Sequence, residues 1–144
     1  MPHEDGNAYA PVVATVSLGG SLCLDITAKP PSSGDANNPN TAEKGLQKKL
    51  EQYQVPTRIF QEPRSLLITT GEAYQELMHG IASIEVDENL NADTVANWSL
   101  LADYKGIEEN GGRSARQTRV SLTYRDVLKV SSAASKVLGG FAKR

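Results

Sequence analysis

The sequence is poor in several features that would place a chain in a special class. It has one cysteine, Cys23, so it cannot form an internal disulfide. The apolar setting of that residue, between Leu22 and Leu24, favours a small buried strand residue over a reactive thiol or a metal ligand. No apolar run approaches the roughly 20 residues that a membrane-spanning helix needs. The first residues lack the cationic region and apolar stretch of a signal peptide, so we expect a nuclear or cytoplasmic protein that is not secreted and does not bind a membrane.

Net charge is also small. The value of −2 argues against a protein that coats nucleic acid through bulk electrostatics. The charge is nevertheless uneven, because residues 113–144 hold eight Lys or Arg and one acid, a balance of +7 that leaves −9 for the first 112 residues. Such a basic end could contact phosphates. The scatter of these cations favours a solvated surface instead.

Histidine occurs only twice, and each histidine stands in a context that suits a metal. His3 belongs to His3-Glu4-Asp5, and His79 precedes Gly80. In an extended segment, positions i and i+2 lie on one side, roughly 6.6 Å apart, so His3 and Asp5 can face one ion. Two histidines and one carboxylate form the ligand set of non-haem Fe(II) oxygenases. The pair alone is a weak signal, since an exposed N-terminal histidine is more often only solvated.

A polar row follows near the C-terminus, within residues 119–125. Read as a strand, this stretch places Arg119, Ser121, Thr123 and Arg125 on one face. We expect the apolar set on the other face, Val120, Leu122 and Tyr124, to pack. Two arginine forks with hydroxyls between them suit a small dicarboxylate. The alternative is a half-buried edge strand whose polar face lies in water.

In this order, His-x-Asp, a distal His and Arg-x5-Arg resemble the AlkB-type Fe(II)/2-oxoglutarate dioxygenase family. Further segments are similar to the eukaryotic AlkB homologue 6 group within that family: Pro2–Gly6, Pro11–Gly19, Glu62–Leu67, His79–Ile81 and Thr118–Thr123. The resemblance runs from Met1 to about Val130, broken by two dissimilar stretches.

Several short strands with long irregular connections suit an antiparallel jelly roll. The resemblance implies the same fold class, a mostly β double-stranded β-helix with short helices and two long loops. It places the His-x-Asp motif at the end of the second core strand, the distal histidine on the seventh, and the two arginines on the eighth.

The resemblance also implies a ligand set and a reaction. Fe(2+) would be held by His3, Asp5 and His79, with 2-oxoglutarate and O2 as co-substrates and no further catalytic residue. Arg119 would bind the far carboxylate of 2-oxoglutarate and Arg125 would assist near the other, with a hydrogen bond from Ser121 or Thr123. The reaction would be oxidative N-dealkylation, with formaldehyde released from an alkylated nucleic acid or protein. The sequence does not choose among DNA, RNA and protein, and it leaves the oligomeric state open.

The chain departs from the family at its N-terminal side. Family members carry a long segment before the His-x-Asp motif, with a substrate lid, the first core strand and an Asn-x-Tyr pair that contacts 2-oxoglutarate. This chain has two residues there. We therefore expect a jelly roll incomplete at that side, with an exposed apolar face and weak Fe(II) binding. A smaller departure is Ser121, where many relatives have Asn.

The pattern along the chain predicts short strands and helical turns. We expect strands near residues 11–18 and 21–27, joined by a hairpin turn at Gly19-Gly20. Further strands are expected at 55–60 and 65–69, and helical turns at 71–78 bring His79 into place. Leu46, Leu50 and Tyr53 fall at helical spacing, as do Val95, Trp98 and Leu101.

The predicted organisation is one domain. It spans 1–130, with loop insertions at about 28–42 and 85–117, and a basic tail follows at 131–144. Two other functional classes stay open. A catalytically impaired fragment acting as a non-enzymatic jelly-roll binding module would bind metal weakly and form no succinate. A phosphate-contacting accessory domain would bind in a salt-dependent manner and ignore metal.

Overall fold

The computed structural model describes residues 1–29, 51 and 54–128. Three expectations lie outside the described residues: the helix with Leu46, Leu50 and Tyr53, nearly all of the 28–42 loop, and the basic tail at 131–144. Within the described ranges, no helix is long and apolar enough to cross a membrane.

The described part of the chain is mostly β, with two three-stranded antiparallel sheets and one two-stranded sheet. The first sheet has the order β4-β1-β8, from Leu66–Thr70, Tyr9–Gly19 and Arg119–Val127. The second has the order β3-β2-β5, from Thr57–Gln61, Leu22–Ala28 and Leu77–Gly80. The small sheet pairs β6 (Val86–Asp87) with β7 (Ser114–Ala115). The helical elements are short: α2 (Gly71–Glu76), η1 (Trp98–Leu100) and α3 (Tyr104–Glu109). The four strands expected before residue 70 are confirmed, each end within two residues of its predicted place.

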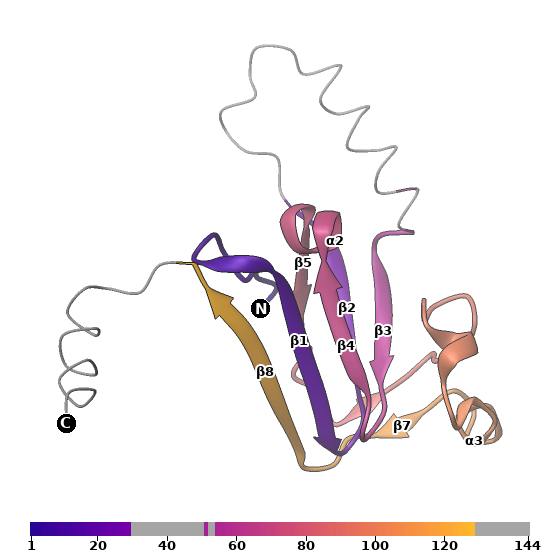
Figure 1. The fold of residues 1–144 in the computed structure, drawn as a ribbon. Coiled ribbons are helices and arrows are strands. Elements are labelled where there is room, and N and C mark those ends of the chain that lie inside the picture. The colour runs from indigo at the N-terminus through magenta and orange to yellow at the C-terminus, as the bar shows by residue number, and fades with distance from the viewer. Residues whose placement is uncertain (30–50, 52–53, 129–144) are drawn as a thin grey trace, which may run out of the picture.

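The expected hairpin between the first two strands is wrong. β1 and β2 follow one another along the chain but belong to different sheets, as Figure 1 shows. The reason is the close approach of Gly19-Gly20 to the chain that enters β8. The Gly20 N–H donates to the Thr118 carbonyl at 2.8 Å, and a Cβ at Gly19 would lie 2.5 Å from that oxygen. Because glycine has no Cβ, the two glycines let the backbone approach this segment closely and continue into the second sheet.

Strand alternation gives the first sheet one face toward the second sheet. Ser17 pairs with Ser121, Thr15 with Thr123 and Val13 with Arg125, so these residues share one face. That face is identified as the inner one because Ser17 hydrogen-bonds to Gln61, the last residue of β3. The two arginines of β8 therefore lie on the side of the sheet that faces β3-β2-β5.

The outer face of the same sheet is apolar and exposed. Its large side chains are between 37% and 59% exposed: Val12, Leu18, Leu66, Ile68, Val120, Leu122 and Tyr124. The expectation that the apolar set of β8 packs is therefore wrong for the described part of the chain. Alternation fixes which side chains share a face, but a second element must cover that face before they are buried. No described element does so.

The core lies on the far face of the second sheet. Its main cluster joins two strand residues, Cys23 and Phe60, to five side chains from the stretch expected as a loop insertion at 85–117: Leu90, Val95, Trp98, Leu101 and Ile107. Hydrogen bonds fix this stretch to β3, because Asn97 accepts from the Phe60 N–H at 2.9 Å and donates to its carbonyl at 2.8 Å. Figure 1 shows the stretch with α3 and β7 beside β3. It supplies most of the core cluster.

Candidate functional site

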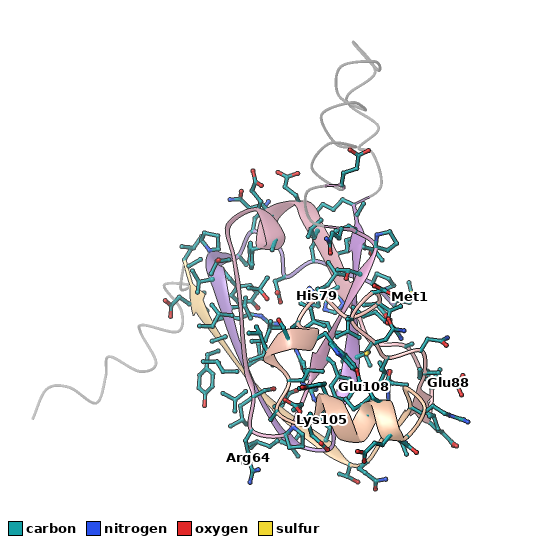
Figure 2. The ribbon with its side chains drawn as sticks, turned by 90° about the vertical axis from the view of Figure 1, so that its right-hand side faces the viewer. Met1, Arg64, His79, Glu88, Lys105 and Glu108 are labelled. Carbon is teal, nitrogen blue, oxygen red and sulfur yellow. The ribbon has the colours of Figure 1, made fainter. Side chains whose placement is uncertain are left out.

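The two histidines, 76 residues apart in the chain, are paired side by side. The His3 N–H donates to the His79 carbonyl at 2.8 Å, and the His79 N–H donates back at 2.9 Å. Directly opposed residues of an antiparallel bridge place their side chains on the same face. The ring centroids are accordingly 4.5 Å apart. The segment before β1 thus extends the second sheet at β5, and Figure 2 shows Met1 close to His79.

The pairing depends on close backbone contact at the end of β5. A Cβ at Gly80 would lie 3.0 Å from the Cα of Pro2, so a glycine lets the N-terminal segment approach the strand. The buried side chain of Tyr74 in α2 adds a second attachment, since its hydroxyl donates to the Gly6 carbonyl at 2.6 Å. These contacts flank Asp5 and hold the His-x-Asp motif against β5.

Asp5 lies on the inner side of the motif and contacts β8. Its side chain is only 5% exposed, and one oxygen accepts from the Arg125 guanidinium at 2.5 Å. The same guanidinium lies over the Tyr9 ring, 5.4 Å from its centroid, in cation–π geometry. Asp5 is therefore charge-paired, and its partner is one of the two arginines that the sequence singled out.

The pKa of the His79 imidazole is shifted by burial and by three neighbouring groups. Burial lowers the pKa of the His79 imidazole, the Asp5 carboxylate opposes that shift, and His3 and Arg125 add to it. A lowered pKa keeps the ring neutral, which is the form that binds a metal. No set of three His, Cys, Asp or Glu side chains in the described ranges has the arrangement of a ready metal site. His3 and His79 are adjacent, while the Asp5 carboxylate stays beside Arg125.

Arg119, at the start of β8, has neutral partners. One terminal nitrogen donates to the Ser17 hydroxyl at 2.8 Å and to the Gln61 side-chain oxygen at 2.6 Å. Its Nε is buried and has no hydrogen-bond partner. Burial lowers the pKa of the guanidinium. Of the ion pairs found in the described residues, none involves Arg119.

The remaining members of the polar row are exposed. Ser121 and Thr123 lie between the arginines on the inner face of β8 and are open to solvent. The Cα atoms of Arg119 and Arg125 are about 20 Å apart along the strand. The binding of one dicarboxylate by both arginines therefore stays a prediction.

An apolar cavity of about 210 Å³ lies beside His79. Most of its lining comes from inner-face residues of the two sheets, including Leu24, Ile26, Ile59 and Leu67, and from α2 through Ala73. Neither arginine of the polar row lines it. The cavity therefore reaches the histidine pair but not the two arginines proposed for 2-oxoglutarate.

Sequence reasoning missed Ser17 and Gln61. Strand alternation could have placed Ser17 on the face of Val13, but its link to Arg119 depends on the register of β1 against β8. No sequence signal joins Gln61 to either residue, because β3 belongs to the other sheet.

Comparison with known proteins relates the chain to a protein that is described as a demethylase. No protein-family profile matches the chain. The chain is 32% identical over 133 residues to a zebrafish (Danio rerio) protein named Probable RNA/DNA demethylase ALKBH6. The match covers 92% of this chain and 50% of the relative, so the chain spans about half the length of the curated relative that it matches. This similarity supports a relationship to the AlkB-like proteins.

Proposed function

We propose that this chain carries the metal and co-substrate site of an AlkB-type Fe(II)/2-oxoglutarate-dependent dioxygenase built on a double-stranded β-helix. The observation that carries the proposal is the meeting of His3 and His79 across a two-residue bridge, with Asp5 and Arg125 beside them. The similarity to the zebrafish relative supports the same family. Two antiparallel sheets that face one another agree with the proposed fold class.

The residue types fit Fe(II). Two imidazoles and one carboxylate match the two-histidine, one-carboxylate set. In this proposal His3, Asp5 and His79 would hold the metal, and the chemistry that it would supply is the activation of O2 with 2-oxoglutarate for oxidation of an N-alkyl group. The chain supplies the ligands and orients the co-substrate.

The proposal gives each of the other residues a role. Arg125 holds the carboxylate of Asp5 and is one of the two charges proposed for 2-oxoglutarate. Arg119 binds the far carboxylate, because its charge has no acidic partner among the described residues. Ser121 and Thr123 offer hydroxyl donors on the same face. The lowered pKa of His79 favours the neutral imidazole, in which one of the two ring nitrogens carries no proton and can bind a metal.

For the substrate, we propose an alkylated nucleic acid. The relative's name refers to RNA and DNA, and this is the only support for that class over protein. With O2, the reaction would hydroxylate an N-methyl group, which leaves as formaldehyde, while 2-oxoglutarate is converted to succinate and CO2.

The test is an anaerobic titration of the protein with Fe(II) in the presence of 2-oxoglutarate. A visible charge-transfer band is expected in the wild type and should be lost in His79→Ala. Glu4→Ala is the matched control, because Glu4 is adjacent to both motif ligands and pairs with Lys29 instead. No band in the wild type at saturating Fe(II) and 2-oxoglutarate contradicts the proposal.

A second candidate has its own support. The Asp5 carboxylate is paired with Arg125, and the three proposed ligands do not form a ready metal site in the described residues. This arrangement favours a non-enzymatic jelly-roll binding module. A succinate assay separates the two, since the module forms no succinate from 2-oxoglutarate.

A further inference from the structure

Three arginines extend from β8 and from the segment between β7 and β8, and they differ in how their charge is balanced. Arg116 pairs with the carboxylate of Asp87 at 2.7 Å, and Arg125 pairs with that of Asp5 at 2.5 Å. Arg119 instead bonds to a hydroxyl and an amide oxygen. It is fixed in place and keeps its full positive charge.

The partners of Arg119 form a closed set of hydrogen bonds. Ser17 donates its hydroxyl hydrogen to the Gln61 oxygen at 3.0 Å, and both oxygens accept from the same guanidinium nitrogen. Ser17 is 1% exposed and Gln61 is 4% exposed. The set joins β1, β3 and β8, and therefore both sheets, so it limits the directions in which the guanidinium can point.

Neutral partners have a specific consequence for anion binding. A carboxylate at Gln61 would accept the same hydrogen bonds but would also neutralise Arg119, as Asp87 does for Arg116. An amide fixes the guanidinium and leaves its charge for a ligand. The buried Nε–H, which lacks a partner, is a further donor that an incoming carboxylate could use.

We propose that Gln61 and Ser17 are positioning residues that make Arg119 a carboxylate-binding site, with Gln61 determining that the site accepts an anion. The inference rests on the proposed function, because it names the residues that prepare Arg119 for the far carboxylate of 2-oxoglutarate. It concerns the charge at position 61 and not the metal ligands.

The decisive variant is Gln61→Glu, which preserves the size and hydrogen-bond acceptance of the side chain and adds one negative charge. Its matched control is Gln117→Glu, which adds the same charge at an exposed position two residues before Arg119. NMR titration of isotope-labelled, metal-free protein with 2-oxoglutarate and with glutarate measures the affinity. The same titration with butyrate, a monocarboxylate, shows how much of that affinity depends on the second carboxylate.

We expect Gln61→Glu to weaken 2-oxoglutarate and glutarate binding at least about tenfold, since a charge-assisted pair to the ligand is lost. Gln117→Glu should bind as the wild type does. Ser17→Ala keeps the charge and removes one acceptor, and we expect a loss of about three- to tenfold. If circular dichroism shows that Gln61→Glu is unfolded, the affinity of Ser17→Ala for the dicarboxylates tests the inference instead.

The outcomes separate this inference from the proposed function. Equal dicarboxylate affinity in the wild type and a folded Gln61→Glu overturns the inference and leaves the proposed co-substrate site intact, because a purely structural role predicts that result. No dicarboxylate binding by the wild type overturns the Arg119 site and this inference together. If Gln117→Glu loses dicarboxylate binding to the same extent as Gln61→Glu, the inference is also overturned, since a negative charge at either position then has the same effect.

Discussion

Arg125 and Asp5 form an ion pair between β8 and the N-terminal His-x-Asp segment, with 2.5 Å between the guanidinium nitrogen and the carboxylate oxygen. The two residues are 120 positions apart in the sequence. The contact joins β8 of the first sheet to the N-terminal segment that pairs with β5 of the second sheet, beside the histidine pair. It also neutralises a carboxylate that is almost fully buried.

Arg125→Ala should destabilise the fold by about 1–3 kcal/mol, because the nearly buried Asp5 carboxylate is left without its charged donor. Urea unfolding followed by circular dichroism measures the change. Arg113→Ala is the matched control, since Arg113 pairs with Glu88 where both side chains are more than half exposed. It should change stability by less than about 1 kcal/mol. Equal losses of stability in the two variants would show that the Asp5–Arg125 pair contributes no more to stability than an exposed ion pair does.

Arg119→Lys should weaken 2-oxoglutarate binding by at least about tenfold, although the charge is retained. An ammonium group cannot reproduce the planar fork that holds Ser17, Gln61 and a carboxylate at once. Calorimetry on the wild type and the variant measures the affinity. Unchanged affinity in Arg119→Lys would remove Arg119 from the co-substrate site.

Asp87→Ala should destabilise the protein by about 3–5 kcal/mol, because it leaves a largely buried guanidinium without its carboxylate. Asp87 accepts from Arg116 Nε at 2.9 Å and from the Cys23 N–H at 3.2 Å, so both partners lose a bond. Urea unfolding measures the loss. The double variant Asp87→Ala, Arg116→Met should recover part of it, and a double variant less stable than the single would contradict this account.

Ile68→Lys should reduce self-association, because it places a charge on the exposed apolar face of β4-β1-β8, on the edge strand β4. Light scattering at increasing protein concentration measures the effect. Leu100→Lys is the control, since Leu100 is more exposed than Ile68 but lies outside that sheet. If both variants associate as the wild type does, the face is not the site of association.

Cys23 should resist thiol reagents in the folded state. Burial, followed by the charge of Asp87, raises the pKa of the thiol from 9.0 to about 12, so little thiolate exists near neutral pH. A raised pKa means that the unfolded chain loses its proton first. Stability from this group is present below pH 9 and is lost as the pH rises from about 9 toward 12. Labelling that is fast compared with unfolding would show that the thiol is accessible.

Much of the local structure could be predicted from residue order alone. The strands of residues 9–19, 22–28, 57–61 and 66–70 follow alternation and turn residues, which act over a few positions. The burial of Cys23 was also predicted from its apolar neighbours, and the structure confirms it. The two histidines and the two arginines were identified as candidate site residues because the histidines are rare and the arginines share one face of a strand. Their use of one metal and one dicarboxylate is still a proposal.

Two wrong expectations and one feature that the sequence did not reveal share one cause. Gly19-Gly20 has the composition of a hairpin turn, yet it connects two sheets because Thr118 approaches it from a distant part of the chain. Val120, Leu122 and Tyr124 have the spacing of a packed strand face, yet they are exposed because nothing in the described residues covers them. The stretch 85–117 looks polar and irregular, yet it contributes most of the core cluster. Each outcome depends on a partner that local pattern does not identify.

By itself, therefore, the sequence determined which segments are extended, which side chains alternate on β8, and which residue types are available for chemistry. These properties depend on backbone sterics and on neighbours within a few positions. Only the tertiary structure decided that His3 lies beside His79, that Asp5 is paired with Arg125, and that Arg119 is held by neutral Ser17 and Gln61. Those contacts join segments between 58 and 120 residues apart, so they depend on strand register and sheet order, which the packing of the whole chain sets.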